Sequence, residues 1–122
     1  MKILIVEDEK PLAEVLKDEF KAHGYSVEIA VDGEDALAKL KSSVPDLILL
    51  DLLLPKIDGF EVLETIKASR RLKDVPVVIL SNLGQDDEIK RGLKLGAKDY
   101  FVKTQHPLKE IVEKVERFLI SP

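Results

Sequence analysis

The chain has 122 residues, no cysteine and a net charge of −4, with 45% hydrophobic and 34% charged residues. This composition excludes a disordered or fibrous chain, disulfides and cysteine nucleophiles, and the charge argues against non-specific nucleic-acid binding. The length suits one domain, residues 1–122. No apolar run near the N-terminus is long enough for a signal peptide or a membrane span, so we expect a cytoplasmic protein with no membrane contact.

Continuous apolar runs predict the buried strands of the fold. The central run, residues 46–51, ends on Asp51, and residues 3–6 and 77–80 form two more. Residues 99–102 complete the set, and a shorter, more polar segment before Asp32 is expected to be a strand at the edge of the sheet.

Apolar residues at helical spacing predict a helix after each strand. Pro11 and Pro107 suit the first turn of a helix, and Asp32 and Asp58 can cap one. A weaker helix is expected at about residues 86–95. The apolar positions that we expect to face inward are Leu12, Val15, Leu16 and Phe20, then Ala36, Leu37 and Leu40, then Val62, Leu63 and Ile66, then Ile89, Gly92 and Leu93, and finally Leu108, Ile111, Val112, Val115, Phe118 and Leu119.

The alternation of five strands with five helices implies a parallel α/β sheet with right-handed crossovers and helices on both faces. In such a sheet the carboxyl ends of the strands share one rim, where ligands bind. The residues that follow the strands are Glu7, Asp8, Asp51, Ser81 and Lys103. One lysine offsets only part of three negative charges, and a hard divalent cation suits carboxylate oxygens, so the sequence predicts a Mg²⁺ site.

Each of these residues also has an ordinary structural interpretation. An aspartate at a strand end is commonly a helix cap or a solvated turn residue, Lys103 alone would more often be a surface charge, and Ser81 alone would more often cap the next helix. What these interpretations explain poorly is the joint occurrence of the set at corresponding strand ends.

The chain resembles a receiver domain of the two-component response regulators over essentially its whole length. The residues that carry the resemblance are Ile5-Val6-Glu7-Asp8, Asp51-Leu52-Leu53-Leu54-Pro55 with Asp58-Gly59, Leu80-Ser81, and Gly96-Ala97-Lys98-Asp99-Tyr100 running into Lys103. Each piece is common, but their order and spacing together are highly specific. The resemblance implies a flavodoxin-like, doubly wound five-stranded parallel sheet with strand order 2-1-3-4-5.

The resemblance also implies roles for the acidic residues. Asp51 would accept a phosphoryl group from a sensor histidine kinase or a phosphotransfer protein and form an acyl phosphate. Asp8 and Asp51 would bind Mg²⁺ directly, Glu7 would act mainly through bound water, and the backbone carbonyl of Leu53 would complete the protein ligands. Such a domain promotes its own phosphorylation but is not a turnover enzyme.

Further implied roles concern the phosphoryl group and the signal. Lys103 and Ser81 would contact phosphoryl oxygens, and Tyr100 matches the aromatic switch position, where it would turn in from solvent as Ser81 moves. Tyr100 also has an ordinary interpretation as a tyrosine on a strand face. The face of the fourth helix, last strand and fifth helix would contact a downstream protein or output domain, with no direct nucleic-acid binding by this domain. Whether phosphorylation promotes a dimer stays open.

The sequence departs from the family pattern in two places. Thr104 follows Lys103 where the family usually has proline joined by a cis peptide, so the loop either keeps a costly cis bond or is rebuilt in trans. Leu53 and Leu83, two residues after Asp51 and Ser81, are apolar and cannot orient an attacking water. We therefore expect a comparatively long-lived acyl phosphate.

Two other functions remain as alternatives. A phosphatase of the haloacid dehalogenase type also uses a strand-end aspartate and Mg²⁺, but it needs a second aspartate where this chain has Leu53. A pseudo-receiver, which binds proteins without being phosphorylated, usually lacks the acceptor or the acid pair, and both are present here.

Overall fold

Strands and helices alternate strictly along the chain in a computed structural model that describes residues 1–120. Each predicted strand and helix is present. The elements are β1 (Lys2–Val6), α1 (Lys10–Ala22), β2 (Ser26–Ala30), α2 (Gly33–Ser42), β3 (Leu47–Leu50), α3 (Gly59–Ala68), β4 (Val77–Ser81), α4 (Asp86–Lys94), β5 (Asp99–Val102) and α5 (Leu108–Ile120).

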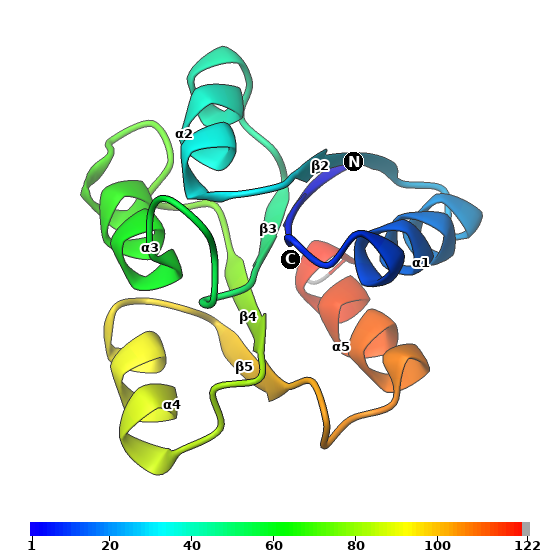
Figure 1. Ribbon diagram of the computed structural model, residues 1–122. Coiled ribbons are helices and arrows are strands. Elements are labelled where there is room, and N and C mark those ends of the chain that lie inside the picture. Colours follow the sequence, from blue (N-terminus) through cyan, green and yellow to red (C-terminus); the bar gives the residue numbers. More distant parts are fainter. Residues whose placement is uncertain (121–122) are drawn as a thin grey trace.

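The five strands form one parallel sheet in the order β2-β1-β3-β4-β5, which confirms the predicted topology (Figure 1). All four residues of β3 are buried, as expected of a central strand with both faces covered. β2 lies at one edge and has only one fully buried residue, Ala30, which agrees with its more polar sequence.

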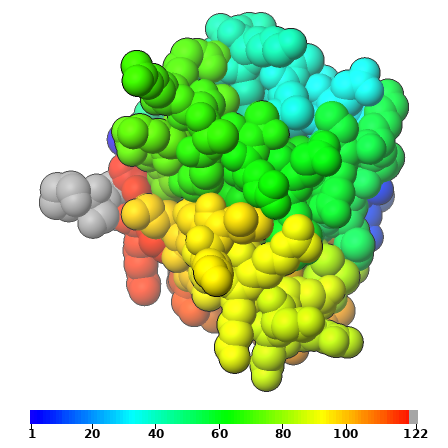
Figure 2. Space-filling model, turned by 90° about the vertical axis from the view of Figure 1, so that its left-hand side faces the viewer, coloured from blue at the N-terminus to red at the C-terminus, as the bar shows by residue number. Residues whose placement is uncertain are grey.

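Helices cover both faces of the sheet and enclose two hydrophobic cores. α1 and α5 pack on one face, where Ile3 and Ile5 of β1 point. α2, α3 and α4 lie on the other face, where Leu4 and Val6 point, and they succeed one another down the surface in Figure 2 from cyan through green to yellow. Successive side chains of one strand therefore pack into the cores on opposite faces of the sheet.

Two predicted inward positions are wrong. Val15 is 47% exposed, because the buried stripe of α1 runs through Ala13, Leu16 and Phe20 and leaves Val15 at its side. Leu93 is 43% exposed, because its neighbour Gly92 occupies the inward position of α4 instead.

The predicted helix caps are confirmed at two helices. The carboxylate of Asp32 accepts a hydrogen bond from the Asp35 N–H at 2.7 Å, and that of Asp58 accepts one from the Phe60 N–H at 2.7 Å. These caps satisfy backbone donors that have no partner within the helix. They fix the starts of α2 and α3 beside the carboxyl edge of the sheet.

Gly59 allows α3 to begin directly against the end of β3. A Cβ atom added there would lie 2.4 Å from the Leu52 Cα and 2.5 Å from the Asp51 carbonyl oxygen. The Gly59 N–H donates to the Leu52 carbonyl at 3.0 Å. The turn after Asp51 therefore depends on a residue without a side chain.

Among the described residues, none of the helices has the length and apolarity that crossing a membrane requires.

We expect Gly59→Ala to lower the free energy of unfolding by about 3 kcal/mol, because the new methyl group would collide with backbone that cannot move aside. Urea denaturation followed by circular dichroism measures this. Glu61→Ala, at an exposed position of the same helix, is the control and should change stability by less than about 0.5 kcal/mol. Equal stability of the two variants would contradict the close packing described here.

Candidate functional site

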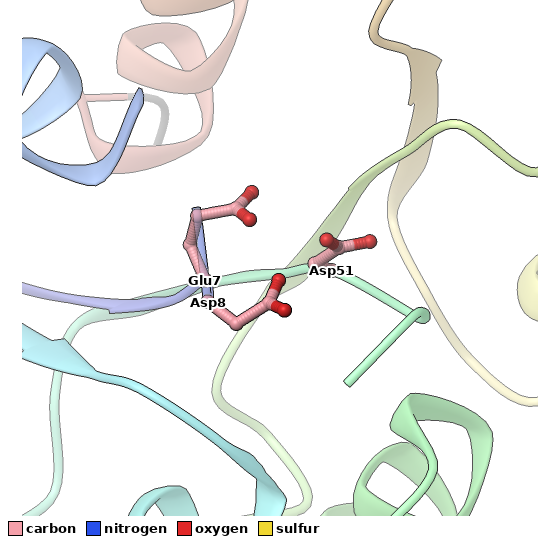
Figure 3. A group of neighbouring side chains, drawn as sticks. All are labelled: Glu7, Asp8 and Asp51. Atoms are coloured by element: carbon pink, nitrogen blue, oxygen red, sulfur yellow. The ribbon is translucent and has the colours of Figure 1, made fainter. Parts of the chain in front are cut away.

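Three carboxylates meet at the carboxyl end of the sheet (Figure 3). Glu7 and Asp8 follow β1, Asp51 follows β3, and oxygens from the three lie within 4.8 Å of one another. The Asp51 N–H donates to the Val6 carbonyl at 3.0 Å, so the pairing of the neighbouring strands sets this distance. Glu7 and Asp51 are each 3% exposed, whereas Asp8 is exposed.

Lys103 lies among the buried carboxylates. Its Nζ is 2.8 Å from Glu7 Oε1 and 3.0 Å from Asp51 Oδ2, and its side chain is 10% exposed. The Lys103 N–H donates to the Ser81 carbonyl at 2.9 Å, which holds the end of β5 beside that of β4. The structure therefore brings together the charged residues that the sequence placed at separate strand ends.

Sequence reasoning missed Glu9. Its Oε2 accepts a hydrogen bond from Lys103 Nζ at 3.0 Å, and its backbone N–H donates to Glu7 Oε2 at 3.0 Å. Its side chain is 53% exposed, so it lies at the outer edge of the group. The feature of the sequence that could have indicated a role for Glu9 is its position as a third acidic residue directly after Glu7 and Asp8.

The pKa values of Glu7 and Lys103 are both raised, but by different causes. Burial raises the pKa of Glu7 to about 7, although its hydrogen bonds to Lys103 and to the Glu9 N–H act the other way. Burial alone would lower the pKa of Lys103, but its hydrogen bonds to Glu7, Glu9 and Asp51 outweigh burial and raise it. Lys103 is therefore a permanent cation at neutral pH, and Glu7 is a carboxyl group that holds its proton unusually well.

The Asp51 carboxylate is held at both oxygens. Oδ2 pairs with Lys103 at 3.0 Å, and Oδ1 accepts the Leu53 N–H at 3.1 Å. The Leu53 side chain is half exposed beside it. The Lys103–Thr104 peptide bond is trans, since residues 1–120 contain no cis bond. The loop after Lys103 is thus rebuilt without the cis bond that the family pattern implied.

Ser81 and Tyr100 both contact the backbone of Leu83. Ser81 is fully buried and its Oγ accepts the Leu83 N–H at 3.3 Å, while the Tyr100 hydroxyl donates to the Leu83 carbonyl. Tyr100 is 8% exposed, and burial, with Glu88 and Asp51 nearby, raises its pKa to about 12. Tyr100 is therefore already turned inward in this structure, whereas the resemblance implied that it would turn in from solvent.

The donor set fits a hard divalent cation. Carboxylate oxygens from three side chains converge, two of the three are buried, and one lysine neutralises them in part. Such a site can neutralise an incoming phosphoryl group while it presents one carboxylate, Asp51, as a nucleophile.

Comparison with known proteins identifies the family. The model of the response regulator receiver domain matches residues 3–116. The chain belongs to the response regulator receiver domain family. Receiver domains of this family use Mg²⁺ at an acidic pocket, and this chain has an acidic cluster of Glu7, Asp8 and Asp51.

Relatives and solved structures agree with this assignment. The receiver domain is 39% identical over 102 residues to the DNA-binding dual master transcriptional regulator RpaA of Synechocystis, covering 84% of this chain and 42% of that protein. The Mn²⁺-bound form of response regulator Rcp1 has a TM-score of 0.87 at 34% identity, with 98% and 94% of the chains covered. The BeF₃-activated receiver domain of Klebsiella pneumoniae RstA has a TM-score of 0.89 at 26% identity, with 99% and 100% covered.

The receiver domain spans about half the length, or less, of the curated relatives that it matches. Those relatives are transcriptional or motility regulators. The chain is thus similar to the signal-receiving part of longer regulators.

We expect the metal-free protein to lose stability as pH rises from about 5 to about 7. The folded-state pKa of Glu7, about 7, lies above its ordinary value of 4.5, so folding favours the protonated carboxyl and this contribution is lost as the proton leaves. Glu7→Gln, which stays neutral, should therefore be more stable than the parent at pH 8 by on the order of 2 kcal/mol, with little difference near pH 5.

Urea unfolding in the presence of a chelator, repeated across this pH range, measures the difference. Glu14→Gln, at an exposed position of α1, is the matched control and should leave the pH profile unchanged. A Glu7→Gln variant that is less stable at pH 8 would mean that the ion pair with Lys103 outweighs burial.

Proposed function

We propose that Asp51 accepts a phosphoryl group from the phosphohistidine of a sensor kinase or phosphotransfer protein, and that the domain relays this signal. The observation that carries the proposal is the buried Asp51 carboxylate, held between Lys103 and the Leu53 N–H and beside two further acids. This arrangement leaves Asp51 oriented, with the half-exposed Leu53 two residues after it.

The residues of this chain supply the nucleophile and two hydrogen-bond donors for the transfer. One oxygen of Asp51 attacks phosphorus as the phosphorus–nitrogen bond of the donor breaks, and the electron pair of that bond stays on the imidazole. Lys103 releases its contact with Asp51 and donates to a phosphoryl oxygen, and Ser81 donates to another. Because phosphoryl transfer depends mainly on alignment and charge neutralisation, no further general base is needed.

A Mg²⁺ ion fits beside Asp51. Asp8 and Asp51 would bind it directly, the Leu53 carbonyl would complete the protein ligands, and Glu7 would act through bound water. The ion would neutralise charge on the phosphoryl oxygens. Support comes from the three convergent carboxylates and from the Mn²⁺-bound form of the relative Rcp1.

The signal would be a population shift at Ser81 and Tyr100. Both residues hold the backbone of Leu83, Ser81 through the N–H of Leu83 and Tyr100 through its carbonyl. A phosphoryl group that draws Ser81 toward Asp51 would change the first of these contacts and so bias the position of the β4–α4 loop. Because Tyr100 is already inward, phosphorylation would stabilise an arrangement that the unmodified protein can adopt.

The proposed partners are the phosphodonor protein at the rim of the sheet and a downstream protein or output domain on the face of α4, β5 and α5. Four cations lie exposed on α4 and the loop after it, namely Lys90, Arg91, Lys94 and Lys98, and α4 forms the lower, yellow part of Figure 2. The domain itself would neither turn over substrate nor bind nucleic acid, and a phosphorylation-dependent dimer is a further candidate assembly. We propose a single domain, residues 1–122, that is located in the cytoplasm.

Incubation with acetyl phosphate and Mg²⁺ should add one phosphoryl group, which mass spectrometry of the intact protein and of its peptides would locate on Asp51. Asp51→Asn should abolish the adduct, as should a chelator, because both nucleophile and ion are required. Asp18→Asn, an exposed position on α1, is the matched control and should be modified like the parent. An unmodified parent would favour a protein-binding module that is never phosphorylated, and steady phosphate release without an adduct would favour a phosphatase.

Leu53→Asn should shorten the lifetime of the acyl phosphate several-fold, because an amide two residues after Asp51 can orient an attacking water and leucine cannot. The measurement is the decay of phosphorylated protein after removal of the donor. Leu93→Asn, which places the same change on a comparably exposed leucine of α4, should decay at the parent rate. Slower or equal decay in Leu53→Asn would show that the apolar residue does not protect the phosphoryl group.

A further inference from the structure

We infer that Glu9 is a positioning residue that holds Lys103 in place while Asp51 is being phosphorylated. The inference rests on the proposed function of Asp51 and extends it to a residue outside the proposed metal and phosphoryl ligands. Its basis is the ion pair that joins the start of α1 to the end of β5, across 94 positions of the chain.

The three N–H donors of the Lys103 ammonium match three carboxylates. Nζ lies 2.8 Å from Glu7, 3.0 Å from Asp51 and 3.0 Å from Glu9. A lysine side chain has no other polar atoms and several rotatable bonds, so the carboxylates around it decide where its charge lies. The position of Lys103 is therefore set by all three acids together.

Two of these three contacts weaken during the proposed reaction. Once an oxygen of Asp51 is bonded to phosphorus, the carboxyl group no longer carries its negative charge, and one N–H of Lys103 turns to a phosphoryl oxygen. Glu7 must at the same time share its charge with a cation and its water. Glu9 is the remaining carboxylate around Lys103 that neither the phosphoryl group nor the cation requires.

The local structure directs Glu9 to this contact. Glu9 is the N-cap residue of α1, yet its side chain makes no capping hydrogen bond and is free to reach Lys103. Its own N–H donates to Glu7 Oε2 at 3.0 Å, while Glu7 Oε1 accepts from Lys103. Glu7, Lys103 and Glu9 thus close a ring of hydrogen bonds, and this ring fixes Glu9 relative to the lysine.

The loop after Lys103 begins with exposed residues, and Glu9 supplies a contact to the lysine on this side. With Thr104 and a trans peptide bond, the backbone beyond the lysine turns at once into exposed residues, Thr104 and Gln105. The lysine is attached on its inner side through its N–H to the Ser81 carbonyl. Glu9, whose side chain is 53% exposed, provides the contact on the outer side.

The test is a double-mutant cycle on the rate of phosphorylation by acetyl phosphate in the presence of Mg²⁺. Glu9→Gln keeps the shape of the side chain and removes its charge, and we expect it to slow phosphorylation about twofold to fivefold, the effect of one partly exposed ion pair. In a Lys103→Met background the same substitution should not slow the reaction, because the residue it acts through is absent. Glu14→Gln should match the parent in both backgrounds.

Equal slowing by Glu9→Gln in both backgrounds would overturn the inference, since Glu9 would then act independently of Lys103. No slowing in the parent background would overturn it too, and faster phosphorylation there would show that Glu9 mainly repels the anionic donor. The parent reaction separates this result from a failure of the proposed function, because phosphorylation of Asp51 in the parent does not depend on the outcome for Glu9.

A second measurement needs no change at Lys103, should Lys103→Met fail to fold. In ¹⁵N-labelled protein the Lys103 ammonium should give a resolved signal, protected from exchange by its three carboxylate partners. Glu9→Gln should shift and broaden that signal, and Glu14→Gln should leave it in place. An unchanged signal in Glu9→Gln would contradict the positioning role even if phosphorylation could not be measured.

Discussion

The carboxyl edge of this sheet depends on one ammonium group surrounded by carboxylates. Lys103 is nearly buried against Glu7 and Asp51, and two uncompensated carboxylates at such a depth would repel each other strongly. The strand order makes the contact possible, because β1 and β3 are neighbours and β5 lies just beyond β4. The Lys103 ammonium therefore reduces the repulsion between the buried acids even when no ligand is bound.

The same ammonium group connects stability with chemistry. While it pairs with Asp51 it holds the carboxylate oriented, and when a phosphoryl group arrives it can pair with the new oxygens. The acids leave an excess of negative charge that the lysine does not cancel, and the exposed Asp8 carries part of it toward solvent. The family's use of a divalent cation follows naturally from this imbalance.

The sequence predicted the elements well, because strands buried on both faces appear as unbroken apolar runs and four of the five helices begin at a recognisable cap or proline. The strand order came from the resemblance, since periodicity does not say which strands are neighbours. Val15 and Leu93 were misplaced because helical spacing defines the width of an apolar stripe but not its centre. Glu9 and the inward position of Tyr100 escaped prediction, because each depends on where a side chain reaches after distant loops have come together.

Gly92 gives α4 an unusual attachment. It is the buried residue of this helix, and a Cβ there would lie 2.6 Å from the Ile79 Cδ1 and 3.2 Å from the ring of Tyr100. α4 is thus seated by backbone lying close to the sheet, by Ile89, which is partly buried against the core, and by Arg91, whose guanidinium lies 4.0 Å over the ring of Phe60. Because Gly92 is the one buried residue among residues 86–94 of α4, we expect this helix to open at a lower free energy than the sheet beneath it.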